Sequence, residues 1–377
     1  FVVAFYDLEP QAPFHVLIIP KEHIESAAVL TEENSGVVSK VFEAAAKIAQ
    51  EYHLPALKQI KSVAWKYACD ARLEAAQQIA KQYGFEKATD DYHDVLSDPE
   101  VDAVVILTRV DMHAKLAIEA ARAGKHIFMQ KSIACSLSDA QKIMDEVKAN
   151  GVKMTVSFMH RYFDETIAAR KILQSGVLGS IQTVRIRNYT RNPIQTVGLY
   201  GGALMDISSH GMDLTRALFG QEIVRARCLQ IDGGPRCGGY TKDLRGDDTY
   251  AVTMYALEDG TKVIQEAAWA QVSQVDRFDV EIHGDKGALY IKHEFLQEPL
   301  LLGITQNGVE NDTQWSVPEV EKTFWGERQH RLFIEDIRND TSNSLSARDG
   351  FITLATMEAV CRSCESGTWE TPSRPRD

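Results

Sequence analysis

Between residues 63 and 158 the sequence alternates short apolar runs with amphipathic segments, and this alternation constrains the fold more than any other feature. The run Ala103–Leu107 contains no polar residue, which is typical of parallel strands that are covered on both faces. Alternation of strands with helices predicts a doubly wound α/β domain. The strands are expected at 63–69, 101–107, 126–128 and 154–158, and the helices at 71–83, 111–123 and 137–149.

After about residue 160 the pattern changes to longer segments in which polar and apolar residues alternate, as in Ile181–Asn188. Asp259-Gly260 marks a hairpin turn between two of these segments. The pattern predicts an α+β domain with a large, mostly antiparallel open sheet. Its further strands are expected at 224–231, 249–257, 262–269 and 277–283, and its helices at 168–174, 327–338 and 347–365.

Charge and composition restrict the kind of partner. A net charge of -12 argues against nucleic acid and anionic membranes. No uninterrupted apolar run is long enough to span a membrane, and the start Phe1–Asp7 is no signal peptide and lacks a Met, as in a fragment. Six scattered cysteines fit a reducing cytoplasm, and Cys361-x-x-Cys364 has neither a second pair nor a nearby His, so we expect no metal site.

The strongest candidate for chemistry is Asp206-x-x-x-His210. Residues four apart share a helix face, so the carboxylate could orient the imidazole. A neutral imidazole can take a hydroxyl proton when an alcohol is oxidised. The spacing alone favours a purely structural Asp–His pair, because such pairs are common outside active sites.

Two predicted parallel strands end in further candidates, Lys131 and Asp70. Ligands of open α/β sheets bind at the carboxyl ends of the strands, so Lys131 could bind a substrate hydroxyl. Taken in isolation, a lysine in this position is more often a solvated loop residue. A carboxylate at Asp70 could accept hydrogen bonds from an adenosine ribose, which favours NAD over NADP. The alternative is that Asp70 caps the following helix.

One expected element is missing. No G-x-G-x-x-G sequence precedes the strand–helix alternation, where a pyrophosphate would need glycine backbone and a helix N-terminus. We therefore expect a nucleotide site without its usual phosphate-binding turn.

From about residue 48 to the C-terminus the sequence resembles the Gfo/Idh/MocA family of NAD(P)-dependent sugar and polyol dehydrogenases. Lys131 falls at the lysine of the family's Glu-Lys-Pro motif, and Asp206 and His210 fall at its Asp-x-x-x-His motif. The other matching pieces are His53–Leu57, Ala68–Asp70, Asp102–Thr108, His113, Ala120–Ile127, Gly284–Gly287, Ser366-Gly367 and Trp369.

The resemblance implies that Lys131 and His210 form the catalytic pair and that Asp206 holds substrate and orients His210. It also implies a dimer or tetramer formed through the large sheet. The sequence departs from the family in reading Gln130-Lys131-Ser132, and in reading Thr108-Arg109-Val110 where Thr-Pro-Asn is usual. The residues implied at the cofactor are Asp70, Arg72, Thr108, His113 and Lys131.

Residues 1 to about 50 resemble instead the histidine triad nucleotide-binding family, in Phe5–Leu8, Pro10–Pro13 and His15–Ile24. That family's catalytic His-x-His-x-His segment is absent from the sequence. We therefore expect a chimaera joined within 47–51, with a histidine-triad-like segment at 1–50, a Rossmann-like domain lacking its first strand at 51–158, and the C-terminal domain at 159–377. Loss of the strand and turn predicts weakened NAD binding.

The expected activity is transfer of hydride between a sugar, cyclitol or polyol hydroxyl and NAD. Alternatives are an NAD-dependent glycosidase of the same family and a catalytically defective sugar-binding protein. Four large side chains could line a polyol site, although aromatic residues in sheets more often belong to the core. They are Arg191, Tyr200, Trp269 and Trp325.

Overall fold

The computed structural model describes residues 53–190, 202–232, 248–269, 277–292, 300–305, 313–321, 323, 325–342 and 344–376. The chain divides into two compact units. The first takes residues up to Phe158 together with 324–351, and the second takes 159–323 and 352–375. A segment near the C-terminus thus joins the first unit.

The strands of the first unit are parallel and, within its described part, form two separate sheets. One pairs β1 (Tyr67–Cys69) with β2 (Lys87–Thr89), and the other has the order β3 (Ala103–Ile106), β4 (His126–Gln130), β5 (Met154–Ser157). β1 is shorter than the expected run because its partner begins at Lys87, opposite Tyr67. No described strand joins β1 to β3, where the missing central strand is expected.

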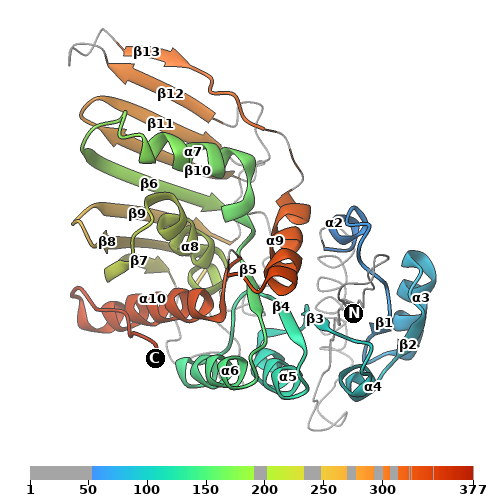
Figure 1. Cartoon of the computed structure of the whole chain (residues 1–377). Coiled ribbons are helices and arrows are strands. Elements are labelled where there is room, and N and C mark those ends of the chain that lie inside the picture. Colours follow the sequence, from blue (N-terminus) through green and yellow to red (C-terminus); the bar gives the residue numbers. More distant parts are fainter. Residues whose placement is uncertain are drawn as a thin grey trace. The chain divides into compact units, whose positions relative to one another are not determined.

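Helices cover the strands of the first unit, as the alternating pattern predicts. They are α2 (Leu54–Lys58), α3 (Leu73–Tyr83), α4 (Tyr92–Ser97), α5 (Val110–Arg122), α6 (Leu137–Ala149) and α9 (Trp325–Asn339). Figure 1 draws α5 and α6 on one side of β3, β4 and β5 and α9 on the other. The Ser136 hydroxyl caps α6 by accepting the Asp139 N–H at 3.1 Å. The predicted doubly wound architecture is therefore confirmed.

A pair of buried histidines joins α2 to α9. His53 Nδ1 lies 3.0 Å from His330 Nε2, and the two side chains are 2% and 1% exposed. The ring of Phe128, on β4, contacts both imidazoles. Ser157, at the end of β5, donates to Gln329 Oε1 at 2.9 Å. These contacts fix α9 on the strands that it covers.

The second unit contains an eight-stranded sheet of order β13-β12-β11-β10-β6-β9-β8-β7. Neighbouring strands are antiparallel except for β6 and β9, so the predicted, mostly antiparallel sheet is confirmed. The strands are β6 (Ile181–Tyr189), β7 (Ile223–Asp232), β8 (Tyr250–Leu257), β9 (Lys262–Ala268), β10 (Arg277–Gly284), β11 (Gly287–Lys292), β12 (Leu300–Thr305) and β13 (Thr313–Ser316).

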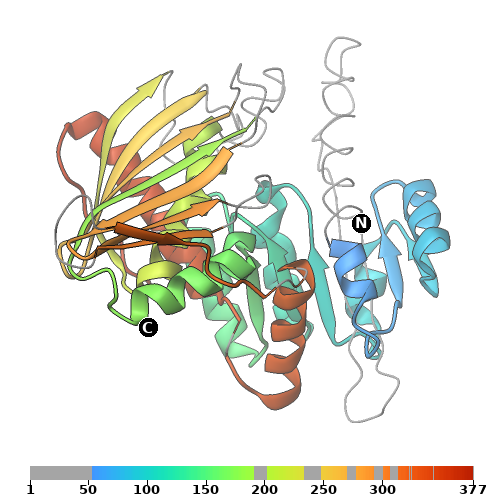
Figure 2. The same cartoon turned by 90° about the horizontal axis from the view of Figure 1, so that it is seen from above.

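The helical elements of the second unit pack on one face of this sheet, as Figure 2 shows for α7 (Asp164–Gln174) and α8 (Ser208–Phe219). A 3-10 turn, η3 (Met159–Tyr162), precedes α7, and a π-helical turn, η5 (Ala203–Ile207), runs directly into α8. The long helix α10 (Ala347–Ser366) reaches the edge strand β7 with its C-terminal part. Trp269 is 1% exposed and packs on Ala203 and Ile207, so it belongs to the core.

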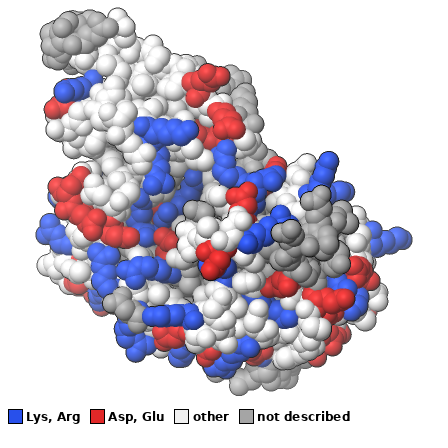
Figure 3. Space-filling view, in the orientation of Figure 1, with Lys and Arg blue, Asp and Glu red and all other residues white. Residues whose placement is uncertain are grey.

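The described surface carries charges of both signs. Figure 3 shows Lys and Arg side chains interspersed with Asp and Glu side chains on one face of the molecule. Among the described helices, none combines the length and the apolar character that crossing a bilayer requires.

Candidate active site

The candidate lysine follows β4 in the first unit. Lys131 is half-buried, and its backbone N–H donates to Gln130 Oε1 at 3.1 Å. The peptide bond between Lys131 and Ser132 is cis. Ser132 is buried and its carbonyl faces inward, so the turn that carries Lys131 is part of the packed interior on one side.

His113, on α5, contacts the turn that carries Lys131. Its Nδ1 lies 2.6 Å from the Ser132 carbonyl oxygen, and its Nε2 lies 3.0 Å from the Thr108 carbonyl oxygen. The ring is 0% exposed, and burial lowers the pKa of His113, partly offset by the two carbonyls. The His113 ring therefore lies between the loop that follows β3 and the turn that carries Lys131. Contact between His113 and the cofactor stays a prediction of the family resemblance.

Thr108 lies at the start of the loop that follows β3. Its side chain is 7% exposed, and the hydroxyl donates to the Arg109 carbonyl at 3.2 Å. Arg109 is the N-cap residue of α5, with its guanidinium Nε 3.3 Å from Asp111 Oδ1. The Arg109 side chain, which stands where the family usually has a proline, is therefore held along the first turn of α5.

Asp70 follows β1, as the sequence predicts, and its side chain is 1% exposed. Its Oδ1 accepts the backbone N–H of Arg72 at 2.9 Å, two residues further on. Arg72, rather than Asp70, is the N-cap residue of α3, and its exposed guanidinium lies 3.7 Å from Asp70 Oδ1. The carboxylate thus shapes the turn into α3, close to the structural alternative considered from the sequence.

In the second unit, the backbone conformation and the surroundings of Gly202 both require a glycine. Gly202 has φ +77°, and a Cβ there would lie 2.1 Å from Asp248 Oδ1. Asp248, 1% exposed, accepts the Leu204 N–H through Oδ2 at 2.7 Å and the Ala203 N–H through its carbonyl at 2.9 Å. The buried carboxylate therefore satisfies N–H groups at the start of the helical segment that carries Asp206 and His210.

Two amide side chains of the sheet hold the same segment from beneath. Asn188 Nδ2 donates to the Ile207 carbonyl at 3.4 Å, and Gln265 Nε2 donates to the Ser208 carbonyl at 3.0 Å. Gln265 Oε1 accepts the Tyr255 hydroxyl at 2.8 Å, which fixes the amide. Gly211 leaves room for it, because a Cβ there would lie 2.4 Å from Gln265 Nε2.

Within residues 202–218, Asp206 and His210 are the two that are half-buried, and every other side chain is buried. Since η5 and α8 are continuous, both residues lie where this otherwise enclosed segment reaches the surface of the unit. The His210 ring meets the ring of His160 edge-on, with centroids 4.7 Å apart. His160 packs in turn on Phe278, at 4.0 Å between centroids.

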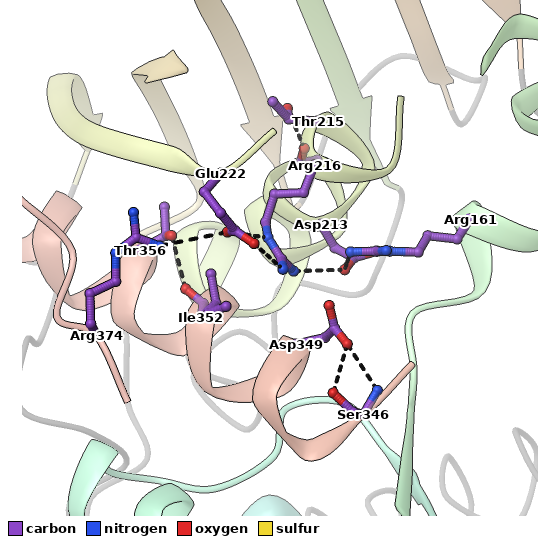
Figure 4. A network of polar contacts seen from close by, with 11 residues as sticks. Arg161, Asp213, Thr215, Arg216, Glu222, Ser346, Asp349, Ile352, Thr356 and Arg374 are labelled. Carbon is purple, nitrogen blue, oxygen red and sulfur yellow. Dashed lines mark hydrogen bonds and ion pairs between the residues drawn. The ribbon is translucent and has the colours of Figure 1, made fainter. Parts of the chain in front are cut away.

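A chain of ion pairs fixes the other side of α8, as Figure 4 shows. Arg161, after β5, binds Asp213 with Nε and Nη2, each at 2.7 Å. Asp213 is 1% exposed and lies 3.8 Å from Arg216, which pairs with Glu222 at 2.8 Å. Arg374 reaches Glu222 at 3.9 Å. The helix one turn beyond His210 is thus anchored by buried charge pairs.

Several supporting residues escaped the sequence analysis. Asp248 and Gln265 act across long sequence separations and carry no local motif. Arg161 and Asp213 were visible as charged residues near predicted elements, but only folding pairs them. Arg191 and Tyr200 lie outside the described residues, as does the side chain of Trp325. No cluster of at least three metal-binding side chains occurs in the described ranges.

Two models of protein families match the sequence of this chain. Residues 170–371 match the C-terminal alpha/beta domain of the Gfo/Idh/MocA oxidoreductase family, and residues 29–158 match its NAD-binding Rossmann fold. The second match includes residues 29–50, which we had assigned to a histidine-triad-like segment. The comparisons support neither the histidine-triad-like segment nor a chimaera, and residues 1–52 lie outside the described part of the chain.

Individual proteins that are similar to this chain are also dehydrogenases. The chain is 28% identical over 301 residues to the scyllo-inositol 2-dehydrogenase (NAD(+)) of Bacillus subtilis, covering 78% of this chain and 84% of that protein. It is 23% identical to the myo-inositol 2-dehydrogenase of Thermotoga maritima, over 83% and 92% of the two chains. A levoglucosan dehydrogenase solved with NADH and levoglucosan superposes with a TM-score of 0.70 at 23% identity, over 81% and 90% of the chains.

Proposed function

Because this chain belongs to the Gfo/Idh/MocA oxidoreductase family, we propose that it transfers a hydride between a hydroxyl-bearing carbon of a sugar, cyclitol or polyol and NAD. The observation that carries the proposal is the partial exposure of Asp206 and His210 on a segment whose other side chains are buried. Contacts of the buried residues Asp248, Gln265 and Asp213 support this segment on several sides and favour a fixed pair of functional groups over an incidental one.

NAD, when bound, would receive the hydride from the carbinol carbon. His210 would take the hydroxyl proton at an imidazole nitrogen, and Asp206 would bind a second hydroxyl and orient the ring. The ammonium group of Lys131 would donate to the substrate oxygen and lower the pKa of the hydroxyl. These roles rest on the family motifs and on the position of Lys131 at the carboxyl end of β4.

The described residues are suited to bind the ribose and nicotinamide ends of NAD. Asp70 and Arg72 follow β1, and Thr108 follows β3, where the ribose and nicotinamide ends of a dinucleotide bind in doubly wound sheets. A glycine turn for the pyrophosphate is not in the sequence, since Gly36 is the one glycine before Gly84. We therefore propose NAD as the cofactor, with NADP disfavoured by the Asp70 carboxylate, and an affinity lower than a complete turn would give.

The first test is a calorimetric titration of the purified full chain with NAD and, separately, with NADP. Binding in the millimolar range, tighter for NAD, is the expected result. Micromolar affinity would refute the weakening and would show that another segment supplies the phosphate site. Lack of binding at millimolar NAD would refute the dehydrogenase proposal and favour a sugar-binding protein that has lost its cofactor.

The second test measures NADH formation with myo-inositol, scyllo-inositol and levoglucosan, the substrates named for the relatives. His210→Gln should lower kcat by about 100-fold to 10,000-fold while leaving NAD affinity unchanged. Lys142→Met, at an exposed lysine paired with Asp139, is the control for Lys131→Met. Release of an aglycone without net NADH would instead indicate the glycosidase alternative. Sedimentation of the same samples tests the proposed dimer or tetramer.

A further inference from the structure

The edge strand β7 and the end of α10 are held together by backbone contacts within the second unit. Cys228 N–H donates to the Ser363 hydroxyl at 3.1 Å. Ala226 and Glu370 exchange two backbone hydrogen bonds, at 2.8 Å and 2.9 Å. Arg227 donates to the Gly367 carbonyl at 3.2 Å. Cys228 and the C-terminal turn of α10 are therefore fixed side by side.

Two thiols meet at this junction. The side chains of Cys228 and Cys364 are hydrogen-bonded to each other, although the two residues are 136 positions apart in the sequence. Both residues are half-buried, whereas Cys361, one turn earlier on α10, is 2% exposed. The register of β7 on β8 shifts between Cys228 and Gln230, so the strand bulges where it meets the helix. The pair is thus adjacent in space and within reach of small solutes.

The hydrogen bond from one thiol to the other stabilises the thiolate form of the acceptor. It lowers the pKa of Cys228, although burial of the side chain opposes this effect. Thiolates, not thiols, are the reactive form toward oxidants and disulfides. Among the described residues, no group of three or more metal-binding side chains includes these sulfurs.

We propose that Cys228 and Cys364 form a peroxide-sensitive thiol pair that closes to a disulfide between β7 and α10. The Cys228 thiolate attacks hydrogen peroxide, forming an S–O bond as the O–O bond breaks and hydroxide leaves. The Cys364 sulfur then attacks the sulfenic acid sulfur, forming the S–S bond as the S–O bond breaks and water leaves. In sum, two thiols and one hydrogen peroxide give one disulfide and two waters.

The test maps the thiols of the full chain before and after treatment with a small molar excess of hydrogen peroxide. Remaining thiols are blocked with iodoacetamide, and the unreduced digest is analysed by mass spectrometry. The expected product is one cross-linked peptide pair that contains Cys228 and Cys364, lighter by two hydrogens and cleaved by dithiothreitol. The oxidised protein should also unfold at a higher temperature, since the cross-link closes a long loop.

Matched variants make the assignment specific. Cys361→Ser, one helical turn away on α10, should leave the cross-link in place, and Cys228→Ser and Cys364→Ser should each abolish it while circular dichroism shows a folded chain. Recovery of Cys228 and Cys364 as alkylated thiols in the wild-type protein would overturn the proposal. So would a cross-link to Cys361 or Cys237, or oxidation of Cys228 to a sulfinic acid without any disulfide.

Discussion

The buried pair His53–His330 should make the first unit lose stability in mild acid. Both rings are enclosed, and burial lowers the pKa of His53 to about 3. Burial also lowers the pKa of His330 well below its usual value, and the charge of His53 lowers it further. The two nitrogens that face each other at 3.0 Å share one hydrogen. Protonating both rings would set two N–H groups against each other, next to the ring of Phe128.

The size of the effect follows from linkage. In the unfolded chain each histidine takes up a proton as the pH falls below about 6.5, while in the folded chain it stays neutral, so the unfolded state binds more protons. Stability is therefore complete above pH 6.5 and falls toward lower pH until the folded pKa is reached, about 3 for His53. At about pH 5 each histidine should cost about 2 kcal/mol of unfolding free energy, and the pair about 4 kcal/mol.

The assay is urea unfolding at about pH 7.5 and about pH 5, where histidines are neutral and charged in the unfolded chain. Hydrogen exchange of the β4 amides identifies the transition that belongs to the first unit. His330→Phe should reduce the stability difference between the two pH values by about 2 kcal/mol, whatever its effect at either one. His93→Gln is the control, because the His93 side chain is 61% exposed. An equal pH difference in wild type and His330→Phe would refute the reasoning.

Three further changes test the supports of the site. Gly202→Ala should lower the free energy of unfolding by more than about 2 kcal/mol in thermal melts, because it adds a clash with Asp248 to a left-handed backbone. Gly220→Ala is the control: Gly220 has φ +64° and open space where a Cβ would lie, so this change should lower the same free energy by about 1 kcal/mol. Asp213→Asn should cost about 3–5 kcal/mol in urea unfolding, since Arg161 and Arg216 lose a buried anion, whereas Glu327→Gln at the exposed Arg331 pair should cost less than about 1 kcal/mol. His113→Leu should cost about 1–3 kcal/mol, because the buried carbonyl that accepts the imidazole N–H loses its donor, and a change below about 0.5 kcal/mol would contradict this hydrogen bond.

The sequence by itself determined the two architectures and the order of most elements. Uniformly apolar runs such as Ala103–Leu107 predicted parallel strands covered on both faces, and the alternation in Ile181–Asn188 predicted the open sheet. These patterns are local, because each residue's burial repeats with the period of its own helix or strand. For the same reason Lys131 and Asp70 could be placed at the ends of strands, and Asp206 and His210 on one helical segment.

Only the tertiary structure decided what holds these residues. Asp248 reaches Leu204 and Gln265 reaches Ser208 across 44 and 57 positions of sequence, and no spacing rule connects such partners. His113, which the family resemblance places at the cofactor, lies between the Thr108 and Ser132 carbonyls, and no local motif predicts these two contacts. Buried polar groups must find partners wherever the chain brings them, so their pairing depends on how distant elements pack and leaves no periodic trace in the sequence.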